Sequence, residues 1–204
     1  FEDGLFRAEG TNRSFSVFEL AGLMQSGELP SDLSGALTAS VSFTGRMPAF
    51  PTGAAVCELE VDPDTGTIEI TRYSSIDDAG QPINPLILHG QVHGGIVQGV
   101  GQALSETIAI DADSGQMLSG SFMDYGMIRA SDMPSFTVDL VEDPTDGNPL
   151  RVKGGGESGI TPSLATVMNA LIDALAPLGV EDLEMPATPA RVWAAIEAAK
   201  GTAR

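Results

Sequence analysis

The segment Lys153–Gly159 places one carboxylate, Glu157, among four glycines, and a predicted helix begins at Pro162. Glycine is costly in regular structure and is favoured where the backbone bends or closely approaches another group. A glutamate held there is either a loop charge in water or a carboxylate aimed at a ligand. The helix dipole favours its ionised form, whereas burial disfavours it. A side chain held between those effects can stay ionised yet accept a proton, which is the chemistry of a general base.

A second segment, Gly90–Gln102, combines glycines with carboxamides on a predicted helix. At 3.6 residues per turn, Gln91, Gln98 and Gln102 fall on one line flanked by glycines, with apolar residues on the opposite side. Each interior glycine costs about 1 kcal/mol relative to alanine, so the segment needs a compensating gain. Either the helix packs closely on a neighbour, or a flat ligand lies against the glycine face with amides as hydrogen-bond partners. The pattern leaves both open, and carboxamides suit a neutral polar heterocycle better than a charged group.

Parts of the sequence also match two other kinds of site. His89 and His93 have a spacing that can place two imidazoles on one metal ion, but the sequence has no third histidine. The glycines at 154–159 also match G-x-G-x-x-G, a motif that needs a core strand after the following helix. Residues 176–182 do not provide that strand, and Glu157 would repel a pyrophosphate. We therefore predict neither a metal site nor a dinucleotide loop.

The composition is that of a folded and strongly acidic chain. Of 204 residues 42% are apolar, and 28 acidic against 10 basic side chains give a formal charge of −18. Nucleic acid and anionic membranes would repel such a chain, so neither is an expected partner. The single cysteine, Cys57, excludes an internal disulfide, and its apolar surroundings predict a buried thiol. The chain begins at Phe1 without an initiator methionine, which indicates a piece of a longer protein.

The elements that must position these residues indicate an α+β fold, because strand pairs mix with helices without regular βαβ alternation. Helices are predicted at residues 15–27, 90–107 and 162–175, the last with Thr161 as N-cap, and from Thr188–Pro189 onward. Strands are predicted as a hairpin at 54–61 and 67–73, and singly at 117–123 and 136–142. Polar and apolar residues also alternate from 37 to 43.

At the two glycine-rich segments the chain resembles the molybdenum hydroxylase family, which includes xanthine dehydrogenase, aldehyde oxidoreductases and the large subunit of aerobic carbon monoxide dehydrogenase. The resemblance covers nearly the whole chain and runs in order through Glu58–Gly66, Asp77–Gly80, Asn84–Pro85, Gly90–Gly101, Phe122–Tyr125, Lys153–Glu157, Asn169–Ala170 and Thr188–Trp193. It implies that residues 1–204 form the C-terminal, second molybdopterin-binding domain of the large subunit, either as a fragment or as a split subunit.

The resemblance implies roles for four residues. In such enzymes the glutamate of the Lys-Gly-x-Gly-Glu motif is the general base that removes a proton from a metal-bound hydroxyl, and Glu157 matches it. The glutamine of the Gly-Gln-x-x-Gly motif contacts the pterin, and Gln91 matches it. Gly155 and Gly156 would let the backbone pass beside the cofactor. The implied activity is an oxidoreductase that uses water as oxygen source on an aldehyde, an N-heterocycle or a small C1 substrate.

The resemblance also implies cofactors and partners. The expected cofactor is molybdenum–molybdopterin in its cytosine dinucleotide form, with 2Fe-2S and FAD on partner subunits. The expected partners are the remainder of the molybdopterin subunit, the iron–sulfur subunit and the FAD-binding subunit, in the cytoplasm. Residues 158–163 differ from the small-and-proline runs of several relatives, so substrate identity is not carried over. The alternative is a non-catalytic interaction or assembly domain that keeps the fold without cofactor.

Overall fold

The computed structural model describes residues 1–30, 40–42, 44 and 49–202, and the chain divides into two compact units, Phe1–Thr44 and Gly45–Arg204. The alternating residues at 37–43 fall largely outside the described residues. Each unit is described by itself.

The first unit pairs two short strands and continues directly into a helix. Strands β1 (Leu5–Arg7) and β2 (Ser14–Ser16) are antiparallel, and α1 spans Val17–Ser26. Ser16 and the first turn of α1 form a capping box, with hydrogen bonds of 3.1 and 2.8 Å in the two directions. The predicted end of this helix is confirmed, because Gly27 adopts the left-handed φ of 74° that terminates helices.

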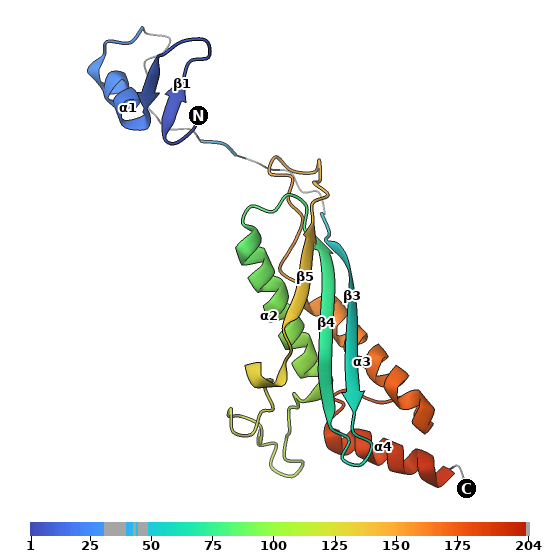
Figure 1. Cartoon of the computed structure of the whole chain (residues 1–204). Coiled ribbons are helices and arrows are strands. Elements are labelled where there is room, and N and C mark those ends of the chain that lie inside the picture. The colour runs from blue at the N-terminus through green and yellow to red at the C-terminus, as the bar shows by residue number, and fades with distance from the viewer. Residues whose placement is uncertain (31–39, 43, 45–48, 203–204) are drawn as a thin grey trace. The chain divides into compact units, whose positions relative to one another are not determined.

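The second unit is built on a three-stranded sheet with the order β3-β4-β5 (Figure 1). Strands β3 (Thr52–Val61) and β4 (Ile68–Asp78) form the predicted antiparallel hairpin, and Gly66 in its turn has a φ of 73°. Strand β5 (Phe136–Val141) lies parallel to β4, which confirms the strand predicted there. The sheet is therefore mixed, as expected for an α+β fold.

The predicted strand at 117–123 is wrong. Met117 forms only an isolated bridge with Ile110. Beyond it the backbone turns on Ser121, whose carbonyl oxygen accepts the N–H of Tyr125 at 2.9 Å and whose hydroxyl accepts the N–H of Met123 at 3.2 Å. These local hydrogen bonds to a serine compete with strand pairing.

Three longer helices complete the second unit: α2 (Pro85–Leu104), α3 (Ile160–Leu175) and α4 (Pro189–Thr202), with 3-10 turns at Ala130–Asp132 and Ala176–Leu178. The C-terminal helix is thus confirmed at its predicted start. Helix α2 begins at residue 85 and not at 90, because Asn84 accepts the N–H of Ile87 at 3.3 Å and proline occupies the first turn.

The predicted N-cap of the third long helix is also wrong. Helix α3 begins after Gly159, which caps it without a side chain. Thr161 lies inside the first turn, and its N–H donates to the carbonyl oxygen of Glu157 at 3.0 Å. The helix therefore starts two residues closer to the glycine-rich segment than the threonine indicated.

Helices α2 and α3 pack on each other and on the sheet, α2 against β5 and α3 against β3 (Figure 1). The fully buried side chains at this junction are Tyr73, Val92, Ile96, Val100, Val167 and Leu171. Within it the Tyr73 hydroxyl lies 3.2 Å from Ser163 Oγ, which donates to the Gly159 carbonyl oxygen at 2.6 Å. The buried thiol is confirmed: Cys57 is 9% exposed, and burial together with the charge of Glu58 raises its pKa to about 11.

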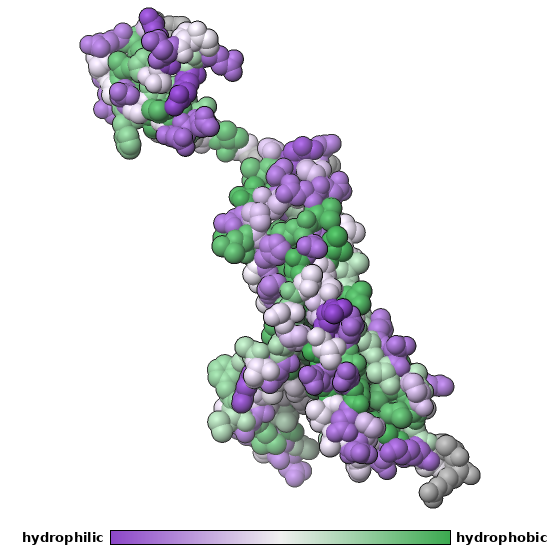
Figure 2. Space-filling view, in the orientation of Figure 1, coloured by the Kyte–Doolittle hydropathy of each residue, from purple (hydrophilic) through white to green (hydrophobic). Residues whose placement is uncertain are grey.

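The chain segment that connects α2 to β5 carries apolar side chains on its surface. The exposed members of this stretch are Ile108, Ile110, Leu118, Phe122 and Met123. Figure 2 shows apolar atoms of this part of the chain beside polar ones at the lower left. Among the described helices, none has both the length and the apolar character that crossing a bilayer requires.

Candidate functional site

The glycine loop, Lys153–Gly159, is anchored to the end of β4 by a cluster of charges. Lys153 Nζ forms ion pairs with Asp78 and with Asp143, the latter at 2.9 Å. The Lys153 and Asp78 side chains are each only 12% exposed. Asp78 also accepts N–H hydrogen bonds from Gly80 at 2.8 Å and from Asp143 at 3.3 Å. This cluster fixes the first residue of the glycine loop against the sheet.

The same contacts keep Asp78 ionised. Burial opposes the charge, but the hydrogen bonds from Lys153 and from two backbone N–H groups outweigh it and lower the pKa of Asp78 below its usual 3.8. The hydrogen bonds to Asp78 and Asp143 in turn raise the pKa of Lys153. Two opposite charges therefore stabilise each other where the loop begins.

We expect Asp78→Asn to lower the melting temperature of the assembled protein at neutral pH. Asp78 binds a proton more readily in the unfolded chain than in the folded protein, because folding lowers its pKa. The stability that ionised Asp78 contributes is therefore present above the pKa of the unfolded state and is lost as pH falls through the pKa of the folded state. The difference from wild type should therefore close in acid. Asp146→Asn is the control, because the Asp146 side chain is 98% exposed in its ion pair with Arg151. A melting-temperature difference between Asp78→Asn and wild type that does not depend on pH would contradict the lowered pKa of Asp78.

The glycines of α2 divide between the two roles that the sequence left open. A Cβ on Gly95 would lie 2.8 Å from the backbone nitrogen of Ile160, so this glycine permits the close packing of α3. A Cβ on Gly90 or Gly94 would meet no atom within 4 Å. The glutamines predicted to share a line are all exposed: Gln91, Gln98 and Gln102. One side of α2 thus packs on α3, and the glutamine side stays open.

A hydrogen bond joins the two segments singled out in the sequence. Gln91 Nε2 donates to the carbonyl oxygen of Gly156 at 3.1 Å, across 65 residues of chain. Its Oε1 accepts no hydrogen bond within the described part of the chain and stays available to a ligand. Gly159 lies so close to the carbonyl oxygen of Val92 that a Cβ there would overlap it. Helix α2 therefore contacts both the middle and the end of the glycine loop.

The three predicted cofactor-binding residues line one open hollow. Gln91, Gly155 and Gly156 border a space of about 570 Å³, which we call the α2 hollow. This size is typical of small-molecule sites. A Cβ on Gly155 would lie 2.5 Å from Leu88 Cδ1, so a side chain there would displace Leu88, which lines the same hollow. Among the described residues that line the hollow, Lys153 is the only cation. Its charge is engaged by the aspartates, so these residues offer neutral amide and backbone groups.

Glu157 belongs to a different side of the same loop. It lines a smaller space of about 180 Å³, the Glu157 pocket, whose other lining residues are Pro51, Thr52, Gly53, Asp77, Ser158, Thr161 and Pro162. The Glu157 side chain is exposed and makes no hydrogen bond to the described residues. The structure thus brings Gln91, Gly155 and Gly156 together, and it places Glu157, which follows Gly156 in the chain, on a separate pocket.

The two histidines and the dinucleotide motif have different surroundings. The His93 ring packs edge-on against the Phe136 ring, with ring centroids 5.5 Å apart. The centroid of the His89 ring lies 6.4 Å from that of the His93 ring. Among the described residues, no group of three or more metal-ligating side chains is brought together. Within the same residues, no strand directly precedes the glycine loop and none follows α3. The pattern G-x-G-x-x-G therefore lacks the strand context that a dinucleotide fold requires.

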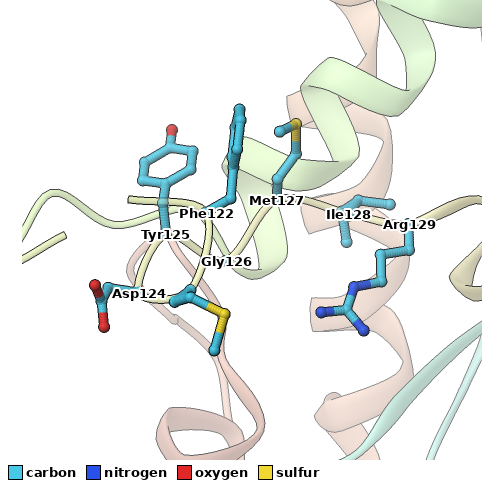
Figure 3. A pocket seen from close by; sticks show the side chains of 8 residues that line it. Phe122, Asp124, Tyr125, Gly126, Met127, Ile128 and Arg129 are labelled. Atoms are coloured by element: carbon cyan, nitrogen blue, oxygen red, sulfur yellow. The ribbon is translucent and has the colours of Figure 1, made fainter. Parts of the chain in front are cut away.

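A further hollow, of about 350 Å³, lies along residues 122–129 (Figure 3). In this view Phe122, Tyr125 and Met127 project to the same side of the segment. Tyr125 donates to Glu106 at 2.6 Å, and Asp124 accepts the hydroxyl of Ser121 at 2.7 Å. The carboxylates at this hollow are thus engaged in local hydrogen bonds, and we assign the hollow no chemical role.

Sequence reasoning gave no individual role to the two carboxylates at the end of β4. Neighbouring side chains on a strand point to opposite faces. Asp78 accordingly meets Lys153, and Asp77 lines the Glu157 pocket. The available signal was the pair itself, because two adjacent acidic residues on a strand point to opposite faces, and a buried carboxylate needs a partner or a polar pocket.

Residues 1–134 match the model of a family described as a molybdopterin cofactor-binding domain. The chain is 36% identical to the gamma subunit of the 6-hydroxypseudooxynicotine dehydrogenase complex of Paenarthrobacter nicotinovorans, over 93% of this chain and 24% of the relative. It is 31% identical to the carbon monoxide dehydrogenase large chain of Afipia carboxidovorans, over 92% of this chain and 23% of the relative. The chain thus spans about a quarter of the length of these curated relatives.

Solved structures show the same likeness. A Cu,Mo-CO dehydrogenase in its carbon monoxide reduced state matches with a TM-score of 0.82 and 31% identity, over 98% of this chain and 25% of the other. Quinoline 2-oxidoreductase from Pseudomonas putida 86 matches with a TM-score of 0.65 and 37% identity, over 68% of this chain and 18% of the other. The mixed arrangement of helices and strands is therefore shared with these proteins.

Proposed function

Because this chain belongs to the molybdenum hydroxylase family of molybdopterin-dependent oxidoreductases, we propose that residues 1–204 form the second molybdopterin-binding domain of a large subunit and supply its general base. Family membership confirms the resemblance that the ordered motifs indicated. The observation that supports the proposal most directly is the hydrogen bond from Gln91 to Gly156, which gathers the proposed cofactor contacts beside Glu157.

The α2 hollow fits a neutral ring system with polar edges. Gln91 would hold the pterin through its free amide oxygen, and Gly155 and Gly156 would let backbone groups approach it. When bound, the molybdenum–molybdopterin group supplies the redox chemistry of the hydroxylation. The described residues that line the hollow include no unpaired cation, so a cytosine dinucleotide form would take its phosphate contacts from the rest of the large subunit.

Glu157 would accept the proton released when water-derived oxygen enters the substrate. Its carboxylate is exposed and makes no hydrogen bond to the described residues, so both oxygens are available to take up a proton. The loop on which it stands is held at its start by Lys153 and at its end by Gly159 against α2. A base fixed at both sides in this way keeps its position relative to the α2 hollow.

The whole reaction belongs to an assembled enzyme. The proposed substrates are an aldehyde, an N-heterocycle or a small C1 compound, and relatives named for carbon monoxide, nicotine and quinoline chemistry support the last two. The proposed partners are the remainder of the large subunit, an iron–sulfur subunit with 2Fe-2S and an FAD-binding subunit, in the cytoplasm. A relative named as one subunit of a complex supports such an assembly.

Metal and pterin analysis of the complex purified with the full large subunit tests this proposal. We expect molybdenum and pterin in near-equal amounts to the large subunit. A complex that carries neither would contradict the proposal and favour an interaction or assembly domain that keeps the fold without cofactor.

We expect Gln91→Leu to weaken cofactor retention in the same complex. The change removes the bond to Gly156 and the free amide oxygen, and a neutral hydrogen bond contributes about 1 kcal/mol, so retention should fall roughly fivefold or more. The measurement is molybdenum content during dialysis against a chelator. Gln102→Leu is the matched control, since Gln102 is exposed on the same line of α2 but does not line the α2 hollow. Equal retention in both variants would remove Gln91 from the cofactor contacts.

A further inference from the structure

We propose that Asp77 receives the proton of each turnover from Glu157, through the hydroxyl-lined Glu157 pocket, and passes it to solvent. This inference rests on the proposed role of Glu157 as base. A base that has taken up a proton must release it before the next turnover. The Glu157 pocket supplies a route away from the α2 hollow, where the cofactor is proposed to lie.

Asp77 is buried in the wall of this pocket. It is 4% exposed, and its Oδ2 accepts the hydroxyl of Ser75 at 2.9 Å. Oδ1 accepts no hydrogen bond from the described residues. Its neighbour across the hairpin is Gly53, where a Cβ would lie 2.9 Å from Oδ1. Glycine at that position therefore leaves room around one oxygen of the carboxylate.

Nothing described around Asp77 neutralises its charge. Its sheet neighbours Gly53 and Leu140 are uncharged, the phenol of Tyr73 on its own strand is neutral, and Glu157 shares the pocket with it. Lys153, the nearby cation, is paired with the adjacent Asp78. Burial raises the pKa of Asp77, and the hydrogen bond from Ser75 only partly opposes this effect. A buried carboxylate without a cation lowers stability, so its presence calls for a role.

Ser158 supplies the second, independent observation. Ser158 lines the same pocket, and its hydroxyl is buried and has no hydrogen-bond partner among the described residues. Buried hydroxyls are normally hydrogen-bonded, and an unpartnered one indicates a missing solvent or ligand contact. A hydroxyl can accept one proton while donating another, and a pocket of about 180 Å³ has room for a short chain of water molecules. Ser158 and such water would connect the two carboxylates.

The proposed step moves a proton and no electrons. The O–H bond on Glu157 breaks as an O–H bond forms on the connecting hydroxyl or water, and the final O–H bond forms on Asp77. Glu157 returns to the carboxylate, and Asp77 then passes the proton to water in the pocket. Asp77 does not touch the substrate, so it is a proton-transfer residue and not a catalytic one.

The test is Asp77→Asn in the full complex, which keeps the shape and can still accept the hydroxyl of Ser75. We expect kcat to fall about 100-fold, the lower end of proton-transfer effects, while KM and molybdenum content stay at wild-type values. Added formate should restore part of kcat by carrying the proton. Asp139→Asn is the control, because Asp139 is exposed on β5 outside the pocket and should retain wild-type kcat.

A second measurement does not depend on activity. Because the fold favours the protonated form of Asp77, its ionisation lowers stability as pH rises through the folded pKa. Asp77→Asn should therefore raise the melting temperature of the assembled protein at neutral pH, opposite in sign to Asp78→Asn.

An unchanged kcat, a loss that formate does not rescue, or an unchanged melting temperature would each overturn the role of Asp77. These outcomes differ from failure of the base assignment. If Glu157→Gln abolishes turnover and Asp77→Asn does not reduce it, only the proton route is wrong. If Glu157→Gln retains turnover, both assignments are wrong.

Discussion

Replacement of Glu157 by glutamine in the full complex is expected to lower turnover by about 10²- to 10⁴-fold, the range of a lost general base. Glutamine has nearly the same shape and leaves the backbone contact with Thr161 intact, but its amide cannot take up a proton at neutral pH. The loss should therefore appear in kcat, with substrate binding and cofactor content preserved.

Single-turnover kinetics together with molybdenum and pterin analysis would measure this effect. Glu181→Gln is a suitable control, because Glu181 is exposed and lines neither the α2 hollow nor the Glu157 pocket. Turnover near the wild-type rate in a Glu157→Gln complex with full molybdenum content would remove the base assignment. A variant that loses its molybdenum would instead indicate a structural role for the carboxylate.

The second large effect is expected from Gly159→Ala. The backbone of Gly159 is helical, with φ of −71° and ψ of −42°, so alanine is acceptable there by conformation. Only space decides: the added methyl group would overlap the carbonyl oxygen of Val92, which belongs to α2 and cannot rotate away. Helices α2 and α3 would have to separate, and overpacking of this kind destabilises by about 3 kcal/mol.

Thermal or denaturant unfolding of the complex measures this change. Gly156→Ala, three positions earlier in the same loop, is the matched control, since a Cβ there meets no atom within 4 Å. Its effect on stability should stay within about 0.5 kcal/mol, as for other substitutions without new contacts. Equal stability of the two variants would show that the approach of α3 to α2 does not depend on glycine.

The parts of the fold that were predictable are those with local signals. The β3–β4 hairpin follows from alternating strands around a turn with Asp62 and Gly66, and α4 follows from Thr188–Pro189. The buried face of α3 follows from its apolar spacing, which places Val167 and Leu171 in the core. Each of these elements is specified by residues within one or two turns of one another.

The errors arose where a distant partner or a competing local bond decided the outcome. Thr161 resembles an N-cap, but α3 already begins at Ile160, because its first turn closes on the carbonyl oxygen of Glu157. The roles of Gly94 and Gly95 could not be separated in the sequence, since only the position of α3 distinguishes them. The ion pair of Lys153 with Asp78 spans 75 residues, and no local pattern marks it.

The candidate site itself was partly predictable. Glu157 and Gln91 were singled out by their glycine surroundings, and the structure places their segments in contact. Their proposed roles came from the family resemblance. Asp77 and Asp78 were part of that resemblance but received no individual role, because the difference between them depends on which face of β4 each occupies.

The long span between Gln91 and Gly156 has a consequence for how the enzyme is made. One wall of the α2 hollow comes from residues 79–91 and the other from 152–156, so a nascent chain that ends before the second wall has no hollow to offer. The bond between the walls joins residues on either side of strand β5 in the sequence, so it cannot form until the chain has been made through Gly156. If the cofactor binds here as proposed, it would load only after the chain is complete through the glycine loop, and an accessory factor that delivers it would act on that chain.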